Sequence, residues 1–311
     1  MARSWRWRVD GERGGFPGGE GGMITQDDAR APAVRRLATS ARRLETRHKG
    51  GRVVWRIWGE GPPVVMLHGG FGSWMHFLRT IPALAESRRV ICPDMPGFGE
   101  SDDPAGPDLL DAIPAALASG LARFAEAHEW LDVAAFSFGT VMSGALAVRM
   151  ARAAPAGPRV RRLALCAPAG LGVPMGGFDG LRSLRAGMSQ AERLAVHRHN
   201  LSRLMLADPA LIDEETVLIQ DANVGAARAV GRPYSRSSAL KDALALRPVE
   251  AVAAIWGSRD AYALRNLHAY EAAIRGLVPD IRAHRIEGAG HWVLYERPGE
   301  VNRVLLDFLN E

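Results

Sequence analysis

Ser137 stands at the centre of AFSFG, residues 135–139, between an apolar run and a helical pattern. A sharp strand-to-helix turn with small flanking residues makes a serine hydroxyl protrude and face backbone N–H groups, as a nucleophile requires. The common form of this motif begins with Gly, where this chain has Ala135. The motif alone fits a serine in an ordinary turn equally well, so the prediction depends on the other residues.

A carboxylate and an imidazole follow the serine, each just beyond a strand-like apolar run. Asp260 ends the segment IWGSRD, and His291 lies in EGAGHW, where flanking glycines let a loop carry the ring over the strand ends. The order Ser, Asp, His is a known order for a catalytic triad. We therefore predict Ser137 as nucleophile, His291 as general base and Asp260 as the acid that orients the base. The alternatives are a surface histidine and an aspartate that caps a helix beginning near Ala261.

Cleavage of an acyl bond also needs N–H donors aimed at the oxyanion that develops. The segment LHGGFG, residues 67–72, ends an apolar run, and its glycines allow backbone amides to approach a substrate closely. We assign the oxyanion hole to the N–H groups of Gly70 and Phe138. His68 is expected to be structural, through hydrogen bonds within the same loop.

From Arg52 onward, strand-length apolar runs alternate with helical patterns, which predicts an α/β fold with a mostly parallel sheet and helices on both faces. The strands are expected at residues 52–57, 63–67, 89–93, 131–136, 160–166, 249–256 and 281–286, and the main helices at 77–85, 110–128, 140–153 and 298–309.

The stretch from Gly170 to Arg247 shows helical patterns without a convincing strand, and it contains an S-x-x-E capping box that begins at Ser189. We interpret residues 172–247 as a helical cap inserted in a core formed by residues 50–171 and 248–311. Residues 1–31 are rich in Gly and Arg without apolar periodicity and are predicted to be a disordered tail, within which Met23 is an alternative start.

These motifs, in this order, resemble those of the alpha/beta-hydrolase superfamily over residues from about 50 to 311. Besides the serine turn, HGG at 68–70 resembles the family's oxyanion loop, DMPGFGES at 94–101 its D-x-x-G-x-G-x-S turn, and GHW at 290–292 the segment that carries its base. The resemblance implies an eight-stranded-type sheet and a serine hydrolase without a cofactor or metal. Dehalogenases and epoxide hydrolases of the family have a nucleophilic Asp where this chain has Ser137.

The default substrate is a small hydrophobic carboxylic ester, cleaved through an acyl-enzyme. Phe71, Trp74, Phe136 and Trp292 are candidate substrate contacts, and each could equally belong to the core. The alternative is C–C hydrolysis of aromatic meta-cleavage products, which the cap, the HGG loop and Trp292 favour. Against it, Phe136 stands where that subgroup typically has Asn, and Thr140 follows Gly139 where a second Gly is typical.

A non-catalytic small-molecule-binding protein on the same fold is a further alternative, which turnover of any activated ester would exclude. The net charge of +5 does not indicate a nucleic-acid surface, because the first 52 residues carry the basic excess. His197 and His199 are two residues apart on a helix, so they point to different faces and suit solvent better than one metal ion. One of the cap arginines could bind a substrate carboxylate; they include Arg182, Arg185, Arg228, Arg232 and Arg236.

No apolar run meets the requirements of a secretory signal or a membrane span, and Cys92 and Cys166 lie in strand-like runs as expected for buried thiols. We therefore expect a cytoplasmic protein with a small-molecule substrate. The sequence leaves open the acyl and leaving groups, the stereoselectivity and the oligomeric state.

Overall fold

The computed structural model describes residues 31–124, 130–153, 157–176, 179–263 and 266–311. Within these residues an eight-stranded sheet has the order β1-β2-β4-β3-β5-β6-β7-β8. The strands are β1 (Arg42–His48), β2 (Gly51–Trp58), β3 (Pro63–Leu67), β4 (Arg89–Pro93), β5 (Trp130–Phe136), β6 (Arg159–Cys166), β7 (Ala251–Gly257) and β8 (Arg282–Ile286).

The sheet is parallel from β4 through β3 to β8, and β1 and β2 pair antiparallel at one side. The central strand β3 is buried along its whole length, as a strand covered on both faces must be. Its side chains alternate between the two faces, with Val65 and Leu67 in one apolar cluster and Val64 and Met66 in the other. The α/β fold class predicted from the sequence is confirmed.

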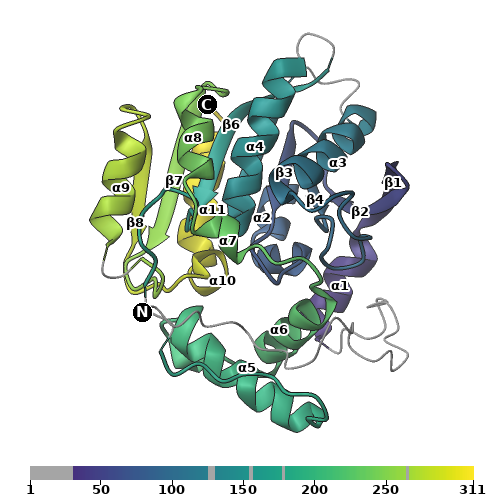
Figure 1. The fold of residues 1–311 in the computed structure, drawn as a ribbon, viewed down its shortest axis with the longest axis vertical. Coiled ribbons are helices and arrows are strands. Elements are labelled where there is room, and N and C mark those ends of the chain that lie inside the picture. Colours follow the sequence, from purple (N-terminus) through teal and green to yellow (C-terminus); the bar gives the residue numbers. More distant parts are fainter. Residues whose placement is uncertain (1–30, 125–129, 154–156, 177–178, 264–265) are drawn as a thin grey trace.

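Helices cover both faces of the sheet (Figure 1). The cluster on one face includes side chains of α3 (Leu109–Phe124), α4 (Phe138–Ala153), α8 (Ala239–Ala245) and α9 (Leu267–Arg275). The cluster on the other face includes α1 (Pro32–Ser40), α2 (Ile81–Ala85), α10 (Val293–Glu296) and α11 (Pro298–Leu309). These two layers hold the strand ends at which the predicted triad residues lie.

Between β6 and β7 the described chain forms helices and no strand. They are α5 (Gln190–Leu204), the short 3-10 helix Pro209–Leu211, α6 (Glu214–Ala226), α7 (Arg232–Ser235) and α8. The capping box is formed as predicted: Ser189 accepts from the N–H of Glu192, whose carboxylate accepts from the N–H of Ser189. In Figure 1, α5 and α6 lie at the lower end of the molecule, away from the sheet. We call residues 172–247 the cap segment.

Several expected boundaries were wrong. The strand β1 was missed because its sequence, RRLETRH, is mostly charged and largely exposed. The helix expected at 77–85 is a 3-10 helix, Trp74–Phe77, followed by the short α2, and α9 begins at Leu267 and not near Ala261.

The tail predicted for residues 1–31, including Met23, lies outside the described residues except for Ala31. Ala31 is 2% exposed and belongs to one of the two apolar clusters. Among the described helices, none has the length and apolar character needed to cross a membrane.

Candidate active site

Ser137 is the single residue between β5 and α4. Its φ is +50°, in the left-handed region that costs a non-glycine residue about 1–3 kcal/mol, so the surrounding structure must hold it there. Its N–H donates to Cys166 O at 3.0 Å, and its carbonyl accepts from the hydroxyl of Thr140 at 2.6 Å. Gly139 completes the turn, because a Cβ at this position would lie 2.1 Å from Leu67 O. The turn therefore requires the glycine that the sequence provides.

The structure brings the three predicted triad residues together. His291 Nε2 lies 2.9 Å from Ser137 Oγ, and His291 Nδ1 lies 2.8 Å from Asp260 Oδ2. Asp260 and His291 are 2% and 4% exposed. The other oxygen of Asp260 accepts from the N–H of Tyr262 at 2.9 Å, so this carboxylate both caps a turn and holds the imidazole. With the Nδ1 proton directed at Asp260, Nε2 can accept the hydroxyl proton.

The predicted oxyanion donors lie next to the serine. Phe138 is the first residue of α4, so its N–H precedes the helical hydrogen-bond ladder, and the helix dipole adds positive potential there. A Cβ built on Gly70 would lie 3.7 Å from Phe138 Cβ, so the two backbones approach closely. Ser137, Gly70 and Phe138 all line one cavity of about 130 Å³.

We call residues 67–72 the oxyanion loop. His68 is fully buried and hydrogen-bonds within this loop, with Nδ1 2.8 Å from Gly69 O, while Nε2 accepts from the N–H of Met95 at 3.0 Å. Both ring nitrogens are therefore in use, and the ring does not line the cavity. The structural role predicted for His68 agrees with these contacts.

We call residues 287–292 the base loop, and a buried carboxylate ties it to the cap segment. Glu296, 4% exposed, accepts from the N–H groups of Gly290 at 2.7 Å and Asp208 at 2.8 Å, and Ala207 N lies 3.0 and 3.1 Å from its two oxygens. The N–H of Trp292 adds a bond to Met205 O at 2.8 Å. The position of His291 thus depends on contacts with the cap segment.

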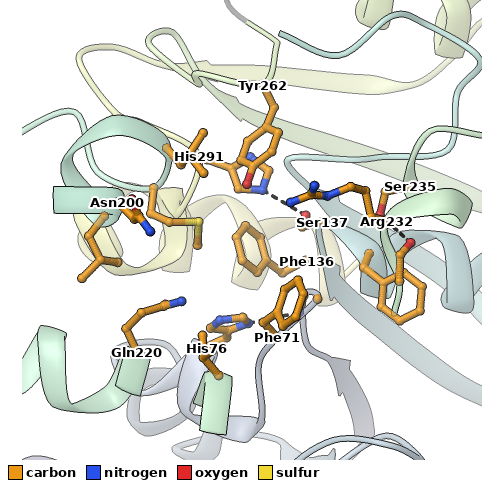
Figure 2. Close-up of a pocket in the computed structure, with 18 of the residues that line it drawn as sticks. Phe71, His76, Phe136, Ser137, Asn200, Gln220, Arg232, Ser235, Tyr262 and His291 are labelled. Carbon is orange, nitrogen blue, oxygen red and sulfur yellow. Dashed lines mark hydrogen bonds between the residues drawn. The ribbon is translucent and has the colours of Figure 1, made fainter. Parts of the chain in front are cut away.

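The cavity lies between the sheet and the cap segment and is mostly apolar (Figure 2). Two of the four predicted substrate contacts, Phe71 and Phe136, line it. Trp74 and Trp292 do not, because both are core residues: Trp74 packs beside Trp58, and Trp292 stacks on Tyr295 with ring centroids 4.2 Å apart.

The structure places one of the arginines named from the sequence at the cavity. Of the five named in the cap segment, Arg232 lines the cavity together with Ser137, and it is half-buried. Burial lowers the pKa of its guanidinium, and the nearby Tyr262 opposes that effect. Arg228 is exposed, pairs with Asp103 at 2.7 Å and does not line the cavity. Figure 2 shows Arg232 on the same side of the cavity as Ser137.

The expectation that both cap histidines face solvent was wrong for His197. This ring is buried and lines the cavity, with Nε2 3.2 Å from an oxygen of Asp221, whereas His199 is half-buried and contacts Gly180 O. In the part of the chain that the structure describes, no cluster of three or more His, Cys, Asp or Glu side chains could hold a metal ion.

Sequence motifs gave no signal for three other polar groups at the site. The ring of Tyr262 packs against that of His291, tilted by 51° with centroids 4.3 Å apart, and burial raises the pKa of its phenol. His76 and Gln220 line the cavity at its opposite end from Tyr262 (Figure 2). These residues come to the site from segments far apart in the chain, so no local sequence pattern predicts that they lie there.

Comparisons with known proteins show the family of the chain. A family model described as "Alpha/beta hydrolase family" matches residues 64–304. The chain is 29% identical over 303 residues to the dihydrolipoyllysine-residue acetyltransferase component of the acetoin cleaving system of Pseudomonas putida, over 94% of this chain and 72% of that protein. It is 29% identical over 268 residues to a 2-hydroxy-6-oxo-6-phenylhexa-2,4-dienoate hydrolase of Burkholderia cepacia, over 81% and 88%. A solved meta-cleavage product hydrolase from Pseudomonas fluorescens is 25% identical with a TM-score of 0.63, over 86% and 97%.

Proposed function

Because the chain belongs to the alpha/beta hydrolase family, we propose that it is a serine hydrolase that cleaves small, apolar carboxylic esters through an acyl-enzyme. The observation that carries this proposal is the continuous contact from Asp260 through His291 to Ser137, at 2.8 and 2.9 Å, at the edge of the cavity. Such a chain activates a hydroxyl that is otherwise a weak nucleophile.

The first half of the reaction forms the acyl-enzyme. Ser137 Oγ attacks the ester carbonyl while His291 Nε2 takes the hydroxyl proton, and Asp260 stabilises the imidazolium that results. The N–H groups of Gly70 and Phe138 donate to the oxyanion. When the tetrahedral intermediate collapses, the C–O bond breaks and the alcohol leaves with the proton from His291.

The second half releases the acid. The oxygen of a water molecule attacks the acyl carbon while the water gives a proton to His291. Collapse of the intermediate breaks the bond to Ser137 Oγ and returns that proton to Oγ.

The apolar lining of the cavity supports a hydrophobic substrate. The side chains that would hold its acyl group include Phe71, Phe136, Met175, Leu201 and Leu204. The size of the cavity, about 130 Å³, is consistent with a small-molecule substrate.

Hydrolysis of a C–C bond in a meta-cleavage product is the second candidate. It is supported by the likeness to the dienoate hydrolase of Burkholderia cepacia and to the solved meta-cleavage product hydrolase. The residue before the nucleophile weighs against it. This residue is Phe136, whose ring centroid lies 5.1 Å from that of His291 and whose side chain lines the cavity. The subgroup typically carries the polar Asn at this position.

A hydrolysis panel separates the two candidates. We expect turnover of p-nitrophenyl esters with a preference for one range of acyl lengths, and slower turnover of 2-hydroxy-6-oxo-6-phenylhexa-2,4-dienoate. A larger kcat/KM for the dienoate than for every ester would establish the second candidate in place of the first. The Ser137→Ala variant is the blank for each substrate, and absence of turnover across the whole panel would favour a binding protein.

A further inference from the structure

His76 lies where the oxyanion loop meets the base loop. Its Nδ1 accepts from the N–H of Gly69 at 3.1 Å, and its carbonyl oxygen accepts from the indole N–H of Trp292 at 2.8 Å. Its ring stands edge-on to the rings of Phe136 and Trp292, with centroids 5.3 and 5.2 Å away. These contacts fix the ring in one orientation.

The same contacts fix its proton. Since Nδ1 accepts a hydrogen bond, the proton of the neutral ring must be on Nε2. The side chain is 2% exposed, and burial holds the pKa of His76 well below its ordinary value, with further lowering by His68 and His291. His76 is therefore an uncharged donor near neutral pH.

This donor faces the cavity without an acceptor. Nε2 has no hydrogen-bond partner among the described residues, and the ring lines the cavity. Gln220 on α6 reaches toward it from the cap segment (Figure 2), and Gln220 Oε1 is buried without a partner among those residues. A buried polar group without a partner costs about 1–3 kcal/mol, so an acceptor left in this state, near a donor that faces the same cavity, suits a ligand.

Helix α6 is held in a fixed position at this end of the cavity. Asn223, one turn after Gln220 on α6, accepts from the hydroxyl of Ser73 at 2.6 Å, and both side chains are buried. Ser73 directly follows the oxyanion loop and precedes the helix that carries His76. The two walls of the site, His76 and Gln220, are thereby fixed relative to each other and to Gly70.

We propose that His76 and Gln220 form a subsite for a second, uncharged oxygen of the substrate, a carbonyl or hydroxyl on the acyl chain. The proposal rests on the ester hydrolysis proposed above and narrows its substrate to oxo- or hydroxyacyl esters. A hydroxyl placed here accepts from His76 Nε2–H and donates to Gln220 Oε1. For a carbonyl, rotation of the Gln220 amide about χ3 presents its N–H in place of its oxygen.

The test compares esters with and without the second oxygen. We would measure kcat/KM for p-nitrophenyl 4-oxopentanoate and 5-oxohexanoate against pentanoate and hexanoate, each normalised to its rate of alkaline hydrolysis. One neutral hydrogen bond corresponds to about three- to tenfold in rate. The unmodified protein should prefer at least one oxo ester by that factor, and both Gln220→Leu and His76→Phe should bring the ratio to about one.

Matched controls separate the subsite from general damage. Gln190→Leu on α5 and His268→Phe on α9 change the same residue types at exposed positions and should keep the preference. His76→Phe also removes the acceptor for Gly69 N–H, so Gln220→Leu is the variant that keeps the test valid if His76→Phe fails to fold. A fluorophosphonate probe reports on Ser137 in every variant.

A ratio of about one in the unmodified protein, with pentanoate turnover and labelling intact, would overturn the subsite and leave the proposed hydrolysis standing. A preference for mono-p-nitrophenyl glutarate that both variants abolish would also overturn it, because the subsite would then bind an anion. Absence of both labelling and turnover would refute the hydrolase itself.

Discussion

Glu296 should contribute more than any other side chain to holding the base loop against the cap segment. Its oxygens accept from Gly290 N–H at 2.7 Å and Asp208 N–H at 2.8 Å, with Ala207 N about equally close to both. In Glu296→Gln one oxygen becomes an NH₂ group. In either orientation this group faces an N–H donor, so at least one hydrogen bond to a charged acceptor is lost.

A hydrogen bond to a charged group contributes about 1.5–3 kcal/mol, and the abandoned N–H is buried as well. We therefore expect Glu296→Gln to lower the free energy of unfolding by about 2–4 kcal/mol in urea titrations. Because Gly290 directly precedes His291, kcat/KM on the best p-nitrophenyl ester should fall at least tenfold, even at temperatures where the variant is fully folded.

The control is Glu300→Gln, an exposed position in the first turn of α11. This change removes only the interaction of a surface charge with the helix dipole and should cost less than about 1 kcal/mol. If Glu296→Gln kept both its stability and its kcat/KM, or lost no more than Glu300→Gln, the argument that this carboxylate joins the base loop to the cap segment would be refuted.

Three further outcomes can be measured on the same protein. Asp260→Asn should lower kcat about 10⁴-fold on p-nitrophenyl esters, because the amide no longer selects the productive imidazole tautomer. Gly139→Ala should prevent folding or activity, since its Cβ would meet a backbone oxygen at 2.1 Å, whereas Gly225→Ala, with open space in α6, should stabilise the protein by up to about 1 kcal/mol. The free energy of unfolding should fall as the pH drops below about 6.5, by up to about 2.7 kcal/mol per pH unit. The reason is that burial lowers the pKa values of His68 and His76 in the folded protein, so that only the unfolded chain takes up their two protons. A free energy of unfolding, measured in urea, that does not change with pH would contradict this.

Much of the fold could be predicted because buried parallel strands leave a simple signal. β3 and β5 are buried at almost every position, so their sequences are apolar runs that polarity alone delimits. β1 carries no such signal, because it pairs on one side only and is largely exposed. The start of α9 was misjudged because Asp260, an ordinary helix-capping residue, caps only a turn here and is held by His291.

The reactive part of the site could be predicted because its chemistry constrains neighbouring residues in the chain. A serine at φ +50° needs a residue such as Gly139 beside it, and such requirements appear as motifs. His76 and Gln220 have no such constraint: they meet across the cavity from segments 144 positions apart, where only the folded chain brings them together. Glu296, likewise, acts through backbone groups of residues 207 and 208, and no side-chain pattern records that contact.

The central claim, that Ser137 is an activated nucleophile, is tested most directly by covalent labelling. The protein would be treated with a fluorophosphonate at neutral pH, and the adduct counted by intact mass and located by peptide mapping. We predict a single adduct on Ser137, none in Ser137→Ala, and slow labelling in His291→Ala, because the hydroxyl then lacks its base 2.9 Å away. An adduct on another residue, or undiminished labelling of Ser137→Ala, would contradict the account.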